Sequence, residues 1–109
     1  GSLNVPTKMP ISRHAIMQKL KGDIMRYVCD ISKGAARVIK VCASSYTAAK
    51  CVIQLSAERD RARRAYREIG REIPDRFDYR LAIVEAPGYH LPEQIIPLES
   101  CTFLSKETL

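Results

Sequence analysis

The fold of this chain depends on residues 36–43, Ala-Arg-Val-Ile-Lys-Val-Cys-Ala, which follow Lys33-Gly34 and precede Ser44-Ser45. The run is short, is rich in β-branched residues and is bounded by turn-forming residues, as is typical of a strand. Apolar residues spaced by seven also cross it, as in an unbroken or kinked helix, in the sets Met17, Ile24, Ile31, Val38 and Leu20, Tyr27, Gly34, Val41. Because a short apolar run fits either period, both alternatives stay open, and we favour the strand.

The residues before this run predict a long amphipathic helix over residues 12–32. Ser12 offers an N-cap oxygen, and apolar residues then recur every three or four positions, at Ile16, Leu20, Ile24, Tyr27, Val28 and Ile31. Gly22 lies inside this helix but costs it only about 1 kcal/mol relative to alanine. Residues 1–11 contain two prolines and are predicted to form an extended arm, of which Gly1-Ser2 resembles a cloning scar.

A second long helix is predicted to begin after Ser44 or Ser45, either of which would cap it, and to end at Ile73 before Pro74. Its expected buried stripe consists of Tyr46, Ala49, Val52, Ile53, Ala62, Ala65, Tyr66, Ile69 and Ile73.

Residues 79–86 are predicted to form a strand that a turn at Pro87-Gly88 follows. Residues 94–98 and 102–104 add short strands, which Pro92 and Pro97 confine to sheet edges. A strand needs a hydrogen-bonded neighbour, and we expect residues 36–43 to pair with residues 79–86. The sequence thus predicts a helix-dominated α+β fold, two long helices packed with a small antiparallel sheet, in one compact domain over residues 12–104 with a tail over 105–109. A mainly α-helical hairpin with an extended C-terminal segment is the alternative.

The net charge of +6 is unevenly distributed along the 109 residues. Residues 1–57 hold nine basic residues against two acidic ones, residues 58–80 hold eight arginines against six acids, and residues 81–109 hold one lysine against four acids. A positive first half attracts an anionic partner such as nucleic acid or an acidic protein.

Two groups of basic residues are candidates for contact with such a partner. The first is a row spaced by seven, with flanking cations, and comprises Lys19, Arg26, Lys33 and Lys40 with Arg13, Lys21 and Arg37. The second belongs to the arginine-rich residues 58–71 and comprises Arg63, Arg64 and Arg67, close to Tyr66. The simpler interpretation is a solvated helix face with ion pairs four residues apart, such as Asp60–Arg64 and Arg64–Glu68.

From these cations we predict a small basic module that binds nucleic acid, with DNA as the expected ligand, through lysine and arginine contacts to phosphates. The alternative is a protein-interaction or assembly adaptor that forms a homodimer and docks an acidic partner. Nothing in the sequence predicts an enzyme, a metal site or a cofactor, because His14 and His90 lie in no metal or nucleophile motif. Glu85, Tyr89 and His90 flank the Pro87-Gly88 turn and form at most a small polar site.

The four cysteines predict free thiols in a reducing compartment, cytoplasmic or nuclear, because Cys29, Cys42, Cys51 and Cys101 lie singly at irregular spacing. A Cys42–Cys51 bridge is the alternative. No stretch approaches the roughly 18 apolar residues that span a membrane, so we expect no membrane partner.

Overall fold

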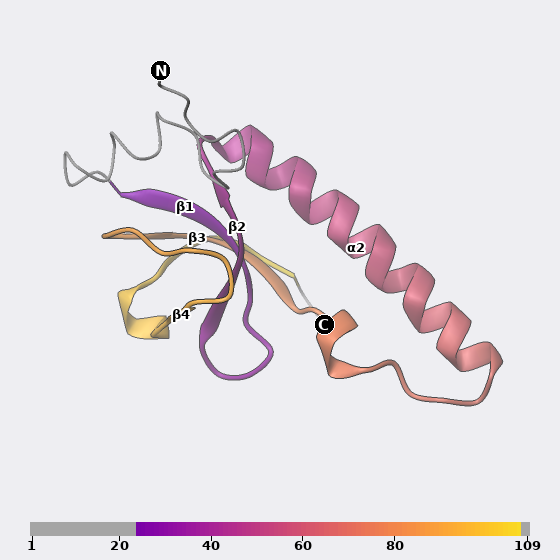
Figure 1. The fold of residues 1–109 in the computed structure, drawn as a ribbon. Coiled ribbons are helices and arrows are strands. Elements are labelled where there is room, and N and C mark those ends of the chain that lie inside the picture. The colour runs from indigo at the N-terminus through magenta and orange to yellow at the C-terminus, as the bar shows by residue number, and fades with distance from the viewer. Residues whose placement is uncertain (1–23, 108–109) are drawn as a thin grey trace, which may run out of the picture.

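The computed structural model describes residues 24–107, in which one long helix lies across one face of an antiparallel sheet (Figure 1). The elements follow in the order β1 (Met25–Asp30), β2 (Ala36–Cys42), α2 (Ser45–Glu68), η1 (Asp75–Phe77), β3 (Leu81–Ala86), β4 (Ile95–Ile96), η2 (Leu98–Ser100) and β5 (Thr102–Lys106), where η denotes a 3₁₀ helix.

The five strands form one sheet in the order β4-β2-β1-β3-β5, and every neighbouring pair is antiparallel. The first strand of the described chain is therefore the central one: Tyr27 of β1 pairs with Val41 of β2 on one side and with Val84 of β3 on the other. The two short C-terminal strands occupy the edges, as expected for segments that follow prolines.

Both faces of the sheet are buried, by different parts of the chain. Side chains alternate along β1, so that Met25, Tyr27 and Cys29 lie in one core while Val28 lies in the other, beneath α2. The C-terminal residues 89–103 contribute Tyr89 and other side chains to the first core. A central strand buried on both faces carries apolar residues on both, as Tyr27 and Val28 do here, which removes the alternation that marks a half-exposed strand in sequence.

Helix α2 begins and ends with standard caps. The Ser44 side chain accepts a hydrogen bond from the Thr47 backbone N–H at 3.1 Å. At the other end, Gly70 adopts a left-handed φ of 69°, and the Arg71 N–H bonds back to the Tyr66 carbonyl at 2.9 Å. This Schellman arrangement ends the helix at Glu68, earlier than the expected end at Ile73.

The prediction of two long helices with a small sheet is wrong, and so is the mainly α-helical alternative. Residues 25–30 form strand β1, whereas the sequence predicted a helix across them; residues 12–23 lie outside the described part of the chain. Tyr27 and Val28 are buried on opposite faces of β1, and Ile24 and Ile31 flank the strand, so their helical spacing does not reflect one buried helix face.

Several local predictions are confirmed, although their pairing is not. Residues 36–42 and 81–86 form strands, and the short strands β4 and β5 lie at the edges. However, β2 does not pair with β3, because β1 lies between them. The sequence predicts a helix over β1, so the strand that pairs with both β2 and β3 was not recognised.

Candidate binding surface on helix α2

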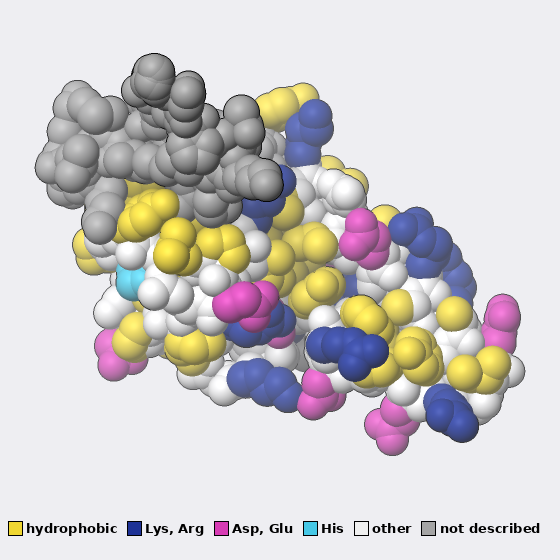
Figure 2. Space-filling model, in the orientation of Figure 1, with side chains coloured by type: hydrophobic (Ala, Val, Ile, Leu, Met, Phe, Trp, Pro, Cys, Tyr) yellow, Lys and Arg dark blue, Asp and Glu magenta, His cyan; other side chains and the backbone are white. Residues whose placement is uncertain are grey.

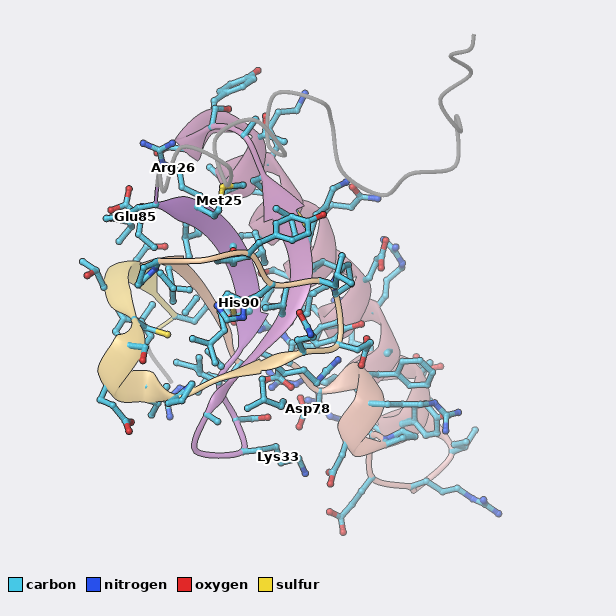
Figure 3. All side chains as sticks on the ribbon, turned by 60° about the vertical axis from the view of Figure 1, so that its left-hand side comes forward. Met25, Arg26, Lys33, Asp78, Glu85 and His90 are labelled. Atoms are coloured by element: carbon cyan, nitrogen blue, oxygen red, sulfur yellow. The ribbon has the colours of Figure 1, made fainter. Side chains whose placement is uncertain are left out.

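Among the predicted cations on β1, β2 and the turn between them, Arg26, Lys33 and Arg37 lie apart and each contact a carboxylate, whereas Lys40 makes no ion pair with any described residue. Arg26 on β1 pairs with Glu85 on β3 at 3.4 Å. Lys33, in the turn between β1 and β2, pairs with Asp75 at 2.8 Å. Figure 3 shows Arg26 beside Glu85 at one end of the sheet and Lys33 at the opposite end. The row spaced by seven therefore does not form a continuous positive surface.

Arg37 of the same row is held between two carboxylates. Its guanidinium contacts Asp30 at 3.3 Å and Glu93 at 3.2 Å. Asp30 is buried and also accepts hydrogen bonds from the backbone N–H groups of Ser32 and Arg80. Burial by itself raises the pKa of Asp30, but these hydrogen bonds outweigh it and leave the pKa below its ordinary value of 3.8. Arg37 thus stabilises the end of the β1–β2 hairpin.

The arginines of α2 that face the sheet are also paired. Arg63, a predicted site residue, contacts Asp78 at 2.6 Å. Arg59 contacts Glu107 at 2.6 Å and donates to the Tyr79 carbonyl at 3.2 Å. Both ion pairs fasten the second half of α2 to segments that flank β3 and β5.

Glu107 completes this attachment through the backbone of β3. Its carboxylate accepts a hydrogen bond from the Leu81 N–H at 2.8 Å in addition to the Arg59 contact. Burial raises the pKa of Glu107, but the hydrogen bonds from Arg59 and Leu81 outweigh this effect, so the pKa falls below its ordinary value of 4.5.

The other predicted site residues either make no ion pair or lie outside the part of the chain that the structure describes. Within residues 24–107, Lys40, Arg64 and Arg67 make no ion pair. The expected Asp60–Arg64 and Arg64–Glu68 pairs are not formed, and Asp60 instead contacts Arg59 at 3.1 Å. Arg13, Lys19 and Lys21 lie outside the described residues.

The unpaired cations of α2 lie mainly on the side that faces away from the sheet. We call this side the outer face of α2; its residues recur every three or four positions and are all exposed: Tyr46, Lys50, Ile53, Ala57, Arg61, Arg64 and Glu68. The opposite side carries Ala48, Val52 and Leu55, which contact the sheet. Figure 2 shows dark blue and yellow side chains, with magenta acidic ones among them, along the diagonal that α2 occupies in Figure 1. The outer face thus combines basic and apolar groups.

A hollow lies at the N-terminal end of this outer face, between the end of β2 and the first turns of α2. Lys40 of β2 and Tyr46, Lys50, Cys51 and Ile53 of α2 line it, and we call it the Lys40–Lys50 hollow. Tyr46 and Ile53 are 73% and 70% exposed. The Lys50 ammonium lies 5.4 Å from the centre of the Tyr46 ring, within the range of a cation–π contact. This site offers two ammonium groups beside apolar surface.

The sequence interpretation missed this site because it placed the buried stripe of α2 incorrectly. Tyr46, Ile53 and Ile69 were expected in the core, yet all three are among the most exposed apolar residues of the described chain. The actual inward side follows a regular spacing of four and three, through Ala48, Val52, Leu55, Arg59, Ala62 and Tyr66. That spacing was present in the sequence, but an arginine inside it concealed the pattern.

The turn at Pro87-Gly88 has a structural role. The Tyr27 hydroxyl donates to the Gly88 carbonyl at 3.0 Å and accepts from the His90 N–H at 3.1 Å, and the two rings meet edge-on at 5.5 Å. Burial raises the pKa of Tyr27 to about 12. Glu85, which was considered for a polar site here, pairs with Arg26 instead. These contacts attach the turn to the central strand.

The four cysteines are free thiols, and Cys42 and Cys51 do not form the bridge considered as an alternative. Burial raises the pKa of Cys29 to about 12 and that of Cys42 to about 11, which disfavours the reactive thiolate. Over residues 24–107, no group of three His, Cys, Asp or Glu residues is arranged to hold a metal ion. Among the same residues, no helix has both the length and the apolar character needed to cross a membrane.

Comparison with protein-family models, with curated proteins and with solved structures found no match, so function is inferred from geometry alone.

Proposed function

We propose that this chain is a protein-interaction module that binds an acidic segment of another protein along the outer face of α2. One contrast carries the proposal: Arg26, Lys33 and Arg37, on β1, β2 and the turn between them, each contact a carboxylate, whereas Lys50, Arg61 and Arg64 of the outer face contact none among the described residues. Lys40 of β2, beside the start of α2, is likewise unpaired among these residues. Unpaired cations on one side of a rigid helix attract an acidic partner and orient it.

The apolar residues of the outer face favour a protein as this partner. Tyr46, Ile53 and Ala57 lie on the same face as the cations, and tyrosine and arginine are enriched where proteins bind each other. A peptide supplies both carboxylates and apolar side chains for such a surface. A nucleic-acid backbone supplies charge alone along its length, and Glu68 on the same face would repel it.

The earlier hypothesis of nucleic-acid binding required the first-half cations to gather on one surface. Among the described members of that set, Arg26, Lys33 and Arg37 are instead paired with acids, and Lys40 and Lys50 alone lie together, at the Lys40–Lys50 hollow. The described residues give the hypothesis no support, and we do not carry it forward.

A second copy of this chain does not fit the outer face well. Two outer faces would bring like charges together, which costs binding energy. The C-terminal acids offer little to offset this repulsion, because Glu85, Glu93 and Glu107 are each occupied by an arginine of their own chain and, of these acids, only Glu99 is unpaired among the described residues. The partner in this proposal is therefore a different protein. Free thiols suit a reducing compartment, and a cytoplasmic or nuclear location is part of the proposal.

Charge reversal on the outer face tests this function. Arg61→Glu combined with Arg64→Glu should weaken binding of a fluorescent peptide of alternating Glu and Leu, about 12 residues long, by about tenfold in anisotropy titrations. Binding by the unchanged protein should also weaken as salt rises from about 50 to about 300 mM.

The matched control reverses two cations away from the outer face, Arg76→Glu with Lys106→Glu. Arg76 lies over the Phe77 ring, and Lys106 lies over Phe103 of β5. This variant should bind the peptide within about twofold of the unchanged protein, since its charges are screened from the outer face. Equal weakening by both variants, or tighter binding of duplex DNA than of the peptide, would contradict the proposal.

A further inference from the structure

The Lys40–Lys50 hollow differs from the rest of the outer face in its chemistry. Its volume is about 560 Å³, large enough for more than one side chain of a partner. Neither lysine contacts a carboxylate among residues 24–107; Glu58, the nearest acid along α2, accepts a hydrogen bond from the Gln54 amide at 3.4 Å through one of its oxygens. A strongly positive and partly apolar hollow is thus open to a ligand.

The position of the hollow on the helix adds to its positive character. The first turn of α2 carries no acidic residue, although aspartate or glutamate is favourable there because the helix dipole is positive at this end. The Ser44 side chain satisfies the Thr47 N–H but brings no negative charge. Lys40, Lys50 and the dipole therefore act on an anion in the same direction.

The apolar wall of the hollow indicates which kind of side chain a bound acidic segment would place between its carboxylates. Ile53 and Tyr46 leave most of their surface to solvent, and their burial by a partner would be favourable. A carboxylate contacting each lysine would place an intervening side chain against this wall.

We propose that the Lys40–Lys50 hollow is the anchor site for the acidic segment and receives one apolar side chain flanked by carboxylates. This inference rests on the proposed function and specifies the chemistry that the partner presents. Two occupants from this chain fit less well by charge: residues 1–23 carry four basic residues against one acid, and the acids of residues 85–107 are largely engaged.

Two peptide probes test the anchor directly. The first is an acidic peptide with a single central leucine among glutamates, and the second has serine in place of that leucine. The unchanged protein should bind the leucine probe about fivefold more tightly, as burial of part of one leucine predicts. Ile53→Ser should remove this preference and leave affinity for the serine probe within about twofold, since Ile53 contributes apolar contact alone.

The two lysines are tested separately from the apolar wall. Lys40→Gln with Lys50→Gln should weaken both probes by about tenfold, while Arg76→Gln with Lys106→Gln should change neither by more than about twofold. Circular dichroism of each variant checks that the fold is retained, which is expected because these side chains are solvent-exposed. In NMR titrations of the full chain, the leucine probe should shift the amide signals of Lys40, Thr47 and Lys50 most.

The outcomes distinguish this inference from the proposed function. If Arg61→Glu with Arg64→Glu weakens binding about tenfold but Ile53→Ser leaves the leucine preference intact, the anchor is wrong and the proposed function stands. If Arg61→Glu with Arg64→Glu has no effect on either probe, the proposed function itself fails. Two further results would overturn the anchor: a DNA oligonucleotide that displaces the leucine probe, or an Ile53→Ser variant whose signals from residues 1–23 shift in the free protein.

Discussion

Four arginines within six residues of α2 have two different roles. Arg59 and Arg63 face the sheet and hold Glu107 and Asp78 at 2.6 Å, whereas Arg61 and Arg64 face solvent and contact no carboxylate among the described residues. The helical period causes this division, because residues four apart share a side and residues two apart lie on opposite sides. These four arginines therefore do not form one surface. Two of them stabilise the fold, and the other two remain available to a partner.

The largest expected effect comes from removing an inward arginine. Arg59→Leu should lower the free energy of unfolding by about 3 kcal/mol, because it leaves the partly buried Glu107 carboxylate without its counter-ion. Arg61→Leu, two residues along, should change it by less than about 0.5 kcal/mol. Urea denaturation followed by circular dichroism measures both values. Similar losses for the two variants would show that the comparison between the inward and outward sides is wrong.

A matched pair of alanines sharpens the same comparison without any change in charge. Ala48 is fully buried against the sheet, while its neighbour Ala49 is exposed. Ala48→Leu should therefore cost about 2 kcal/mol of stability through overpacking, whereas Ala49→Leu should cost almost nothing. Thermal unfolding of the two variants provides the measurement. A stable Ala48→Leu protein would mean that the interface between α2 and the sheet is looser than described.

The smallest effect is a dependence of stability on acid. The pKa values of Asp30 and Glu107 are lowered in the folded protein from ordinary values of 3.8 and 4.5. A lowered pKa means that the folded state binds protons less readily than the unfolded state, so the stability from both groups is present above about pH 5 and is lost as pH falls below about 4. Denaturation at a series of pH values should show this decline.

The matching variant is Glu107→Gln, which should be less stable at neutral pH and should lose less stability on acidification. The control is Glu99→Gln, since Glu99 is exposed and makes no ion pair among residues 24–107. An unchanged acid dependence in Glu107→Gln would remove Glu107 as its source.

Local patterns predicted the elements better than the way in which they associate. Strands β2 and β3 and the start of α2 were recognisable, because β-branched runs, a serine cap and prolines act over a few residues. The central strand β1 was not recognised, since burial on both faces gave it apolar residues at helical spacing. Its misassignment also produced the incorrect pairing of β2 with β3.

The candidate site was predictable only in part for a related reason. Lys40 and Arg64 were named from the excess of positive charge, and both are unpaired among the described residues. Tyr46 and Ile53 were assigned to the core, because apolar residues are ordinarily buried and Arg59 interrupted the true inward stripe. Arg59 is acceptable there because its guanidinium contacts Glu107, 48 residues away, and donates to the Tyr79 carbonyl, 20 residues away.

The sequence by itself determined the composition, the excess of basic residues and the local signals that begin and end α2 and strands β2 and β3. Tertiary structure alone decided which strand is central, which arginines are neutralised and which side of α2 remains open. The physical reason is the range of the interactions: propensities and caps act between neighbours in the chain, whereas strand pairing and ion pairs join residues that only the folded chain brings together.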